Sequence, residues 1–572
     1  MTFLDSRRLT GPGLLLDGPG AILEIQLDDP QRSLALAAWR RAARRMLDAV
    51  GWSGETLATR IFAGGASLAL SAPADALYAA TEVNEWAWAA AEAEIQGGPE
   101  PDFVAAADRI RAAIREEQCP ALLALRDAAR ARGLTFLSDE EGVSVGAGTG
   151  ALVWPLDRLP EPGAVDWDRV HEIPTALVTG SNGKTTVVRL LAAMVAETGQ
   201  ITGTTSTDAV TVGRVTIAQG DYSGPEGARM LLRRPEVEAA VLETARGGLL
   251  RRGLTVERAD VAVVTNIASD HLGEFGVQDL GALAETKLLV TRAVGPEGGV
   301  VLNADDPVLV VGAATVQAPV IWFSLEPDRP TLLRHIRAGG AAAVCAGDDL
   351  LLATGDTLYV VGAISDLPMA QGGAARHNVA NALAAMAAAQ VLGVPVEVMG
   401  RVLRRFGGNA EDNPGRANVM ELGGVVVVID FAHNPHGVAA LVRMAASFPA
   451  RRRLLLLGQA GDRSDADLSG LARAAVAFEP DRIVLKEMEH YRRGRQPGEV
   501  PRILADELQQ LGFPAGAIAQ AGSELDGVRE ALSWARAGDL LLLTVHEDRA
   551  AVVGLLERLR AEGWRAGEAV PG

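Results

Sequence analysis

The chain has 572 residues, of which 48% are hydrophobic and 22% are charged, a composition typical of a globular protein with room for about three or four domains. Its formal net charge of −18 argues against a nucleic-acid-binding surface, which would normally carry a basic stripe. The two cysteines, Cys119 and Cys345, are far apart in the sequence, which excludes a disulfide framework and fits a reducing cytoplasm. We find neither a signal peptide nor an uncharged apolar run of about 18 residues, and therefore expect a cytoplasmic protein without membrane contact.

Residues 1–150 predict a small N-terminal α+β domain. Strand-like alternation covers residues 21–29 and two short patterns within 60–74, and helical periodicity covers residues 33–50 and 76–95. Trp86 and Trp88 lie on one side of the second helix, where we expect them to fill the core. Residues 142–150 (GVSVGAGTG) resemble a dinucleotide-binding loop, but the prolines that follow exclude the helix that such a loop needs. We predict a linker over residues 151–171.

The most informative stretch is Thr175–Thr186, TALVTGSNGKTT. An apolar strand leads into Gly180, Ser181, Asn182 and Gly183, and Lys184, Thr185 and Thr186 then open a helical pattern. Such a turn points backbone N–H groups at a phosphate, with a lysine for the β- and γ-phosphates and a threonine for Mg²⁺. A strict Walker A motif would have glycine where Val178 stands, so this is a shorter G-x-x-G-K-T-T variant. The flanking strand and helix favour a phosphate loop over a plain glycine turn, and we predict that the chain binds ATP.

Strand and helix patterns alternate from Ile173 to about Glu411, which is typical of a doubly wound parallel sheet. Four further strand–helix units follow from about Gly423, and their unbroken Val and Leu runs predict a sheet covered on both faces. The predicted fold class is therefore α/β. It comprises a central P-loop domain (172–412) and a C-terminal Rossmann-like domain (413–572), preceded by the N-terminal α+β domain.

Several polar side chains follow the buried strands of the predicted central domain. Glu243 and the pair Asp270-His271 come at strand ends, which face the same crevice as the phosphate loop in an open α/β sheet. Glu243 would be a suitable hard-oxygen ligand for Mg²⁺, although a simple polar strand cap explains it equally well. Lys287 lies on the next helical stretch and, taken alone, is most simply a solvated lysine.

Asn378 and Asn381 lie three residues apart on a helical stretch, so they share one face. Their amides could read the flat edge of a base. The alternative is that Asn378 is an ordinary helix N-cap.

Together these motifs resemble the Mur ligases, which are three-domain, ATP-dependent amino-acid ligases. GSNGKTT, HNVANALAA, NPGR and DFAHNP carry that resemblance, and VLETARGGLLRRGL, TNIASDHLGEFG, GDRSDADL and RGRQPGEVP are similar to the Mur-ligase half of the cyanophycin synthetases. The N-terminal domain is similar to that of the same synthetases, more weakly. Those synthetases carry an ATP-grasp domain between these two parts. Here roughly 25 residues separate them, fewer than the 50 or so that a domain needs.

The resemblance implies roles for individual residues. Lys184, His271 and Lys287 would be catalytic, with one Mg²⁺ on Thr185 and Glu243 and a second on His271 and a carbamylated Lys287. The remaining implied roles are contacts to adenine by Asn378 and Asn381, closure on phosphate and ribose by Arg416 and Asp430, and substrate binding by Arg246, His433, Asn434 and Arg495.

The implied activity is an amide-forming ligation through an acyl phosphate, joining an arginine-like amino acid to a carboxylate of an aspartate-containing acceptor. Two alternatives stay open: a Mur- or folylpolyglutamate-type ligase for another amino acid, and a non-catalytic ATP-binding partner of a polymer synthetase. Besides its substrates, we expect a separate ATP-grasp-containing synthetase and a second copy of the chain as partners. Neither nucleic acid nor a membrane is expected.

Overall fold

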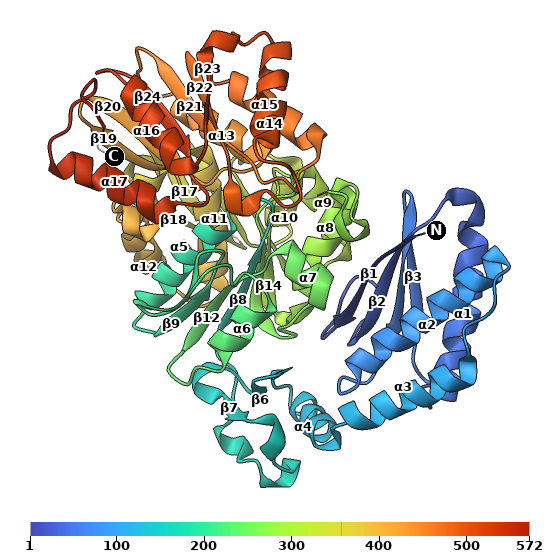
Figure 1. Cartoon of the computed structure of the whole chain (residues 1–572). Coiled ribbons are helices and arrows are strands. Elements are labelled where there is room, and N and C mark those ends of the chain that lie inside the picture. Colours follow the sequence, from blue (N-terminus) through green and yellow to red (C-terminus); the bar gives the residue numbers. More distant parts are fainter. Residues whose placement is uncertain (1, 271, 356, 571–572) are drawn as a thin grey trace.

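The structure, a computed structural model, describes residues 2–270, 272–355 and 357–570. It contains three units, each built on its own sheet, and a small three-stranded sheet that links the first two (Figure 1). Within the described residues, no helix is long and apolar enough to cross a membrane. The α/β fold class predicted from the sequence is confirmed.

The N-terminal unit is a four-stranded antiparallel sheet in the order β1-β2-β4-β3, packed against helices. Trp86 and Trp88 are buried in its core, as expected. Strand β1 was not predicted, because its sequence TFLDSRRL lacks regular alternation; it pairs with β2 through a register shift between Phe3 and Asp5. The elements are β1 (Thr2–Leu9), β2 (Gly20–Gln26), α1 (Asp29–Ala49), β3 (Leu57–Phe62), β4 (Gly65–Ser71), α2 (Leu77–Gln96) and α3 (Phe103–Glu117).

A short connecting region follows, with α4 (Pro120–Ala131) and the antiparallel strands β5 (Phe136–Asp139), β6 (Gly142–Val145) and β7 (Leu152–Trp154). The glycine-rich stretch at 142–150 forms β6 and a 3₁₀ turn, and no α-helix follows it before β8. This agrees with the prediction that the stretch is not a dinucleotide-binding loop. From β7 the chain passes through short 3₁₀ turns into the central sheet.

The central unit is an eleven-stranded sheet in the order β11-β10-β9-β12-β8-β13-β14-β15-β16-β17-β18. Seven strands from β9 to β16 run parallel, and antiparallel hairpins extend both edges. Its strands are β8 (Thr175–Thr179), β9 (Thr202–Thr205), β10 (Ala209–Val212), β11 (Val215–Gln219), β12 (Ala239–Glu243), β13 (Ala259–Val264), β14 (Val294–Asn303), β15 (Val320–Ser324), β16 (Ala342–Ala346), β17 (Asp349–Thr354) and β18 (Thr357–Ala363).

Helices cover both faces of this sheet, so most side chains in the middle of its parallel strands are apolar. One face carries α5 (Lys184–Ala196), α11 (Arg376–Val391) and α12 (Val396–Leu403). The other carries α6 (Pro225–Leu232), α7 (Arg246–Arg252), α8 (Leu280–Leu288), α9 (Pro307–Gly312) and α10 (Pro330–Arg337).

The C-terminal unit is a six-stranded sheet in the order β19-β20-β24-β21-β22-β23, in which only β19 is antiparallel to its neighbour. The four predicted strand–helix units are present; β19, β23 and α16 were not predicted. The strands are β19 (Asn418–Leu422), β20 (Val425–Asp430), β21 (Arg453–Leu457), β22 (Arg482–Lys486), β23 (Ile518–Ala521) and β24 (Leu540–Thr544). The helices are α13 (Pro435–Ala445), α14 (Asp465–Val476), α15 (Glu499–Gln510), α16 (Glu524–Trp534) and α17 (Arg549–Ala561).

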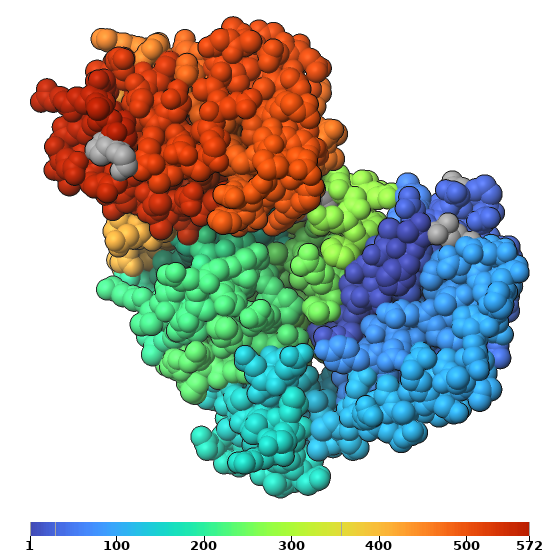
Figure 2. All heavy atoms as spheres, viewed as in Figure 1, coloured from blue at the N-terminus to red at the C-terminus, as the bar shows by residue number. Residues whose placement is uncertain are grey.

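The C-terminal unit sits on the central unit, and the N-terminal unit lies against another side of it, beside α7 (Figure 1, Figure 2). The carboxyl ends of the parallel strands in the central and C-terminal sheets meet at the first of these two contacts. That is where ligands bind in open α/β sheets.

Candidate functional site

The phosphate loop connects β8 to the first turn of α5. Gly180 and Gly183 have φ angles of 144° and 85°, which other residues rarely adopt. There is also no room for a side chain: an added Cβ would lie 1.8 Å from Thr265 Oγ1 at the first position and 2.2 Å from Asn381 Oδ1 at the second. Both glycines are therefore required by backbone conformation and by close packing.

The end of the neighbouring strand β13 holds this loop in place. The side-chain oxygen of Asn266 accepts a hydrogen bond from the Asn182 backbone N–H at 3.0 Å, and its Nδ2 donates to the Asn182 carbonyl at 3.0 Å. Thr265 Oγ1 donates to the same carbonyl at 2.6 Å, and Ser181 Oγ donates to Ala268 O at 2.9 Å. The loop is thus rigid before any phosphate arrives, which favours tight binding.

Glu243 ends β12 beside the phosphate loop and is 2% exposed. Thr185 Oγ1 donates to its Oε2 at 2.8 Å, while its Oε1 is buried and has no hydrogen-bond partner. Burial raises the pKa of Glu243, and the charge of Lys184 opposes that rise. A divalent cation on Oε1 would supply the missing partner, so the Thr185 and Glu243 pair fits the predicted Mg²⁺ site.

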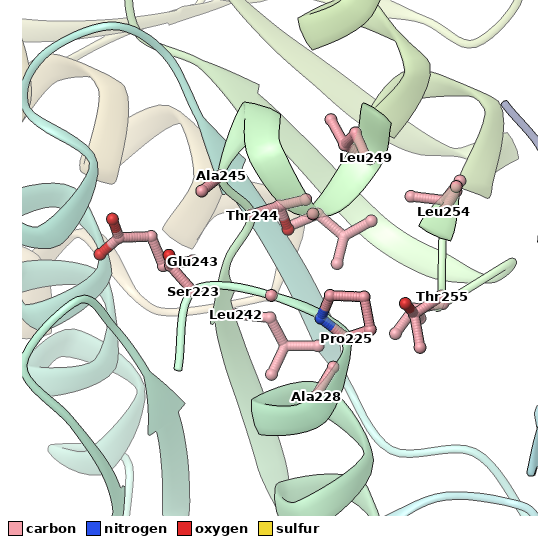
Figure 3. A pocket seen from close by; sticks show the side chains of 15 residues that line it. Ser223, Pro225, Ala228, Leu242, Glu243, Thr244, Ala245, Leu249, Leu254 and Thr255 are labelled. Atoms are coloured by element: carbon pink, nitrogen blue, oxygen red, sulfur yellow. The ribbon is translucent and has the colours of Figure 1, made fainter. Parts of the chain in front are cut away.

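Glu243 also lines a small pocket (Figure 3). It is lined by residues such as Ser223, Pro225, Thr244 and Leu249, and its free volume is about 20 Å³. That is enough for a single water molecule.

Lys287 is buried at 3% exposure, so the simple interpretation as a solvated helix lysine is wrong. Its Nζ donates to the carbonyl of Gly180 at 2.9 Å, directly under the phosphate loop. Burial, and then the neighbouring Lys184, lower the pKa of Lys287 to about 7. His271 lies outside the described residues, and among those described no group of three or more His, Cys, Asp or Glu side chains could hold a metal. The second cation therefore stays a prediction.

Asn378 and Asn381 are both buried on α11. The helix begins at Arg376, so Asn378 is not its N-cap; Nδ2 of Asn378 instead donates to Met369 O at 2.9 Å, and its Oδ1 accepts from Asn381 at 3.2 Å. Since Asn381 packs on Gly183, the pair lies beside the phosphate loop. Contact with adenine stays a prediction.

The C-terminal unit reaches the phosphate loop through side chains. Asn434 caps α13 and donates from Nδ2 to Asn182 Oδ1 at 3.0 Å, and His436 Nδ1 lies 3.1 Å from Asn182 Nδ2. Asn413, buried at 2% exposure, donates to Thr186 Oγ1 at 3.1 Å. Three side chains from the C-terminal part thus contact the loop and the first turn of α5.

Asp208, on the loop between β9 and β10, joins the same two units. It accepts hydrogen bonds from Arg189 at 2.8 Å and from Arg549 of the C-terminal unit at 2.7 Å. Burial would raise the pKa of Asp208, but Arg416, Arg549 and Arg189 outweigh it, and the pKa lies below its usual value. Arg416 stacks on Phe431 with 4.2 Å between its Cζ and the ring centre.

Asp430 holds the backbone near Arg416. Its two oxygens accept the backbone N–H groups of Ala417 at 2.6 Å and Ala432 at 2.7 Å. It thereby ties the ends of β19 and β20 together. The predicted contact between Asp430 and a ribose stays a prediction.

Asp270 faces a histidine and an arginine of the C-terminal unit. Its Oδ2 lies 3.8 Å from His433 Nε2, and its Oδ1 lies 3.7 Å from Arg463 Nη2. Arg246, at the start of α7, is buried and forms an ion pair with Glu274, and the charge of Asp270 also acts on it. Positive charge therefore gathers around Asp270.

Arg495 supports the loop that carries Arg463. It donates to the carbonyls of Gly461 at 3.0 Å and Arg463 at 2.8 Å, and to Asp465 at 2.7 Å. In the structure it therefore holds the loop that carries Arg463. A direct contact with substrate stays a prediction.

The chain matches two family models, the Mur ligase middle domain over residues 178–389 and the Mur ligase glutamate ligase domain over residues 415–544, which together span more than half of it. The chain belongs to the Mur ligase family. This confirms the family that the sequence motifs predicted, whose members are ATP-dependent carboxylate–amine ligases.

Relatives and solved structures agree with this assignment. This Mur ligase is 42% identical over 339 residues to a cyanophycin synthetase of Synechocystis sp., covering 59% of this chain and 38% of that protein. It is 28% identical over 405 residues to UDP-N-acetylmuramoyl-L-alanyl-D-glutamate–2,6-diaminopimelate ligase of Geobacter metallireducens, covering 66% and 74%. Escherichia coli FolC in complex with ADP has a similar fold, with a TM-score of 0.51 at 19% identity, covering 68% of this chain and 90% of that chain. The chain spans about two fifths of the length of the cyanophycin synthetases that it matches.

Several residues at the site of this Mur ligase were not found from the sequence. Asn413, His436, Asp208, Arg549 and Arg463 reach the site only through the contact between two units. Asn413 and Arg463 are part of the NPGR and GDRSDADL motifs, and His436 directly follows DFAHNP, so these motifs could have pointed to them. The others carry no local signal.

Proposed function

We propose that this Mur ligase joins an amino acid, arginine first among them, to a carboxylate of an aspartate-containing acceptor, using ATP and an acyl-phosphate intermediate. One observation carries the proposal most directly. The unpartnered Oε1 of Glu243 lies beside Thr185 and Lys184, where α13 of the C-terminal unit approaches the phosphate loop. A metal–phosphate group and a second substrate could both be bound there.

A carboxylate is a poor acyl donor, because oxide cannot leave from it. Transfer of the γ-phosphoryl group of ATP to a carboxylate oxygen gives an acyl phosphate and ADP; attack by an amine then forms the amide and releases phosphate and a proton. Lys184 and the backbone N–H groups of the loop stabilise the charge on the transferring phosphoryl group. A Mg²⁺ held by Thr185 and Glu243 would neutralise further phosphate charge.

Lys287 is proposed to act as its carbamate. An ammonium group cannot bind a cation, whereas a carbamate is an oxygen anion on a long arm. Carbamylation requires the neutral amine, and the lowered pKa of about 7 makes that form abundant at neutral pH. Burial beneath Gly180 would place the group within the phosphate-binding region.

The acceptor side is proposed to lie around Asp270. Arg246, Arg463 and His433 gather there, and guanidinium groups bind carboxylates with two parallel hydrogen bonds. The choice of arginine and of an aspartate-containing acceptor rests on the similarity to cyanophycin synthetases. A separate ATP-grasp-containing synthetase would then supply the acceptor.

One experiment distinguishes the proposed function from the two alternatives, a ligase of different specificity and a non-catalytic ATP-binding protein. The purified chain is incubated with ATP, Mg²⁺ and bicarbonate, and phosphate release is measured across arginine, lysine and other amino acids, with aspartate-containing, glutamate-containing and muropeptide acceptors. Release that needs both arginine and an aspartate-containing acceptor supports the proposal. Release with another pair identifies a ligase of different specificity. Nucleotide binding with no release for any pair indicates the non-catalytic ATP-binding partner.

A further inference from the structure

We propose that the N-terminal unit holds the loop at residues 272–278 (the 272–278 loop) in place, and that Arg7 is a positioning residue for the acceptor site. This rests on the proposed function. The 272–278 loop begins two residues after Asp270 and contains Glu274, the ion-pair partner of Arg246. The N-terminal unit contacts this loop through Arg7, Phe62 and Ala63.

Arg7, on the edge strand β1, is 8% exposed and connects both units. Its Nε donates to Leu250 O on α7 at 2.9 Å, and Nη2 donates to Glu24 of its own unit at 2.7 Å. Its guanidinium group lies over the ring of Phe275, 4.7 Å from the ring centre. One buried cation therefore binds the C-terminal part of α7 and the 272–278 loop together.

The turn between β3 and β4 holds the other end of the same loop. Gln278 Oε1 accepts from the Ala63 backbone N–H at 2.9 Å, and its Nε2 donates to Ala63 O at 2.7 Å. Gly276 packs against the ring of Phe62, since an added Cβ would lie 2.6 Å from Phe62 Cδ1. The loop is thus attached to the N-terminal unit at two separate points.

Phe275 has a positive φ of 51°, a strained conformation for a residue with a side chain. Surrounding contacts must maintain such a conformation, and the contact between Phe275 and Arg7 is one of them. The neighbouring Glu274 pairs with Arg246, on which Asp270 also acts. Loss of the Arg7 contact should therefore disturb Arg246 and the acceptor site, and leave the phosphate loop unchanged.

The test compares three variants of the full chain. Phe275→Ala removes the ring without changing the N-terminal unit. Arg7→Met combined with Glu24→Gln removes the cation without leaving Glu24 as an unpaired buried charge. Arg60→Ala is the matched control, because Arg60 forms an exposed ion pair with Glu285 across the same contact.

Two measurements are made on each variant. We expect amide hydrogen exchange in residues 272–278 to accelerate about tenfold in the first two variants and to stay unchanged in the control. We expect the KM for the acceptor to rise about tenfold, with the KM for ATP within about twofold of wild type. A general loss of folding would lower turnover and accelerate exchange throughout the chain, and this result would overturn the proposal.

Unchanged exchange in the 272–278 loop of both variants, or equal rises in the two KM values, would overturn the proposal. If the wild-type chain turns over no acceptor, the proposed function fails by itself. The exchange measurement then decides alone whether Arg7 holds the loop.

Discussion

The two contacts made by the central unit are built differently. Towards the C-terminal unit, the hydrogen bonds and ion pairs between described residues all involve side chains, such as Asn434 with Asn182 and Arg549 with Asp208. Towards the N-terminal unit, backbone groups pair directly: Thr10 N with Arg252 O at 2.8 Å, and Leu254 N with Pro12 O at 2.6 Å. We call these the side-chain contact and the backbone contact.

The difference indicates which contact opens. Polar side chains can exchange a partner for water or for a ligand at small net cost, whereas paired backbone groups buried at an interface are costly to separate. ATP would enter and ADP leave at the side-chain contact, which lies at the phosphate loop. The backbone contact would keep the N-terminal unit and the 272–278 loop fixed through the cycle.

The largest expected effect comes from the phosphate loop at the side-chain contact. Lys184→Ala removes the positive charge that stabilises the transferring phosphoryl group and should lower turnover at least about 10²–10³-fold. Lys184 is half-buried and, among the described residues, donates one long hydrogen bond, to Ser181 O at 3.4 Å, so the melting temperature should stay close to wild type. Phosphate release and differential scanning fluorimetry measure the two effects, and near-normal turnover would refute the phosphate-loop assignment.

Lys287→Met should reduce turnover about 10²-fold, because it removes the proposed carbamate. Omitting bicarbonate should slow the wild type and not the variant.

The pKa of Lys287, lowered to about 7, also predicts a pH effect on stability. Between about pH 7 and about pH 10.5, the usual pKa of a lysine, Lys287 holds more of its proton in the unfolded chain than in the folded one. Lys287 therefore makes the free energy of unfolding rise with pH in this range. The contribution should be absent from the variant, and denaturant titrations at several pH values measure it.

A smaller effect is expected at Arg549, which bridges the two units by side chains alone. Arg549→Ala should raise the KM for ATP about tenfold and increase the radius of gyration of the nucleotide-free chain in X-ray scattering.

The depressed pKa of Asp208 means that its ionised form persists below the usual pH range. Acid should weaken this contact only as the pH falls through that depressed value. An unchanged radius with full affinity for ATP would show that this ion pair does not hold the units together.

The smallest effect is expected at an exposed ion pair beside the backbone contact. Arg60 and Glu285 are 3.2 Å apart, with the Glu285 side chain 66% exposed. Arg60→Ala should change the unfolding free energy by less than about 0.5 kcal/mol. Denaturant titration gives this value, and a loss several times larger would mean that the backbone contact depends on exposed charges.

The sequence predicted what depends on local pattern. The phosphate loop, Glu243 at its strand end and the alternating units of both large sheets follow from periodicity and from short motifs. The contacts that assemble the site do not, because Arg549 and Asp208 are 341 positions apart and Arg7 and Leu250 are 243 apart. An isolated arginine or aspartate gives no signal of such a partner. The burial of Lys287 was likewise hidden, since its helix has no clear polar face.

The most direct test of the central claim uses an acceptor whose carboxylate carries ¹⁸O. The chain is incubated with this acceptor, arginine, ATP, Mg²⁺ and bicarbonate, and the released phosphate is analysed by mass spectrometry. If the carboxylate attacks the γ-phosphoryl group, one ¹⁸O atom should appear in phosphate for each amide formed, and ADP should be unlabelled. Amide formation with unlabelled phosphate, or with the label in AMP, would contradict the acyl-phosphate mechanism.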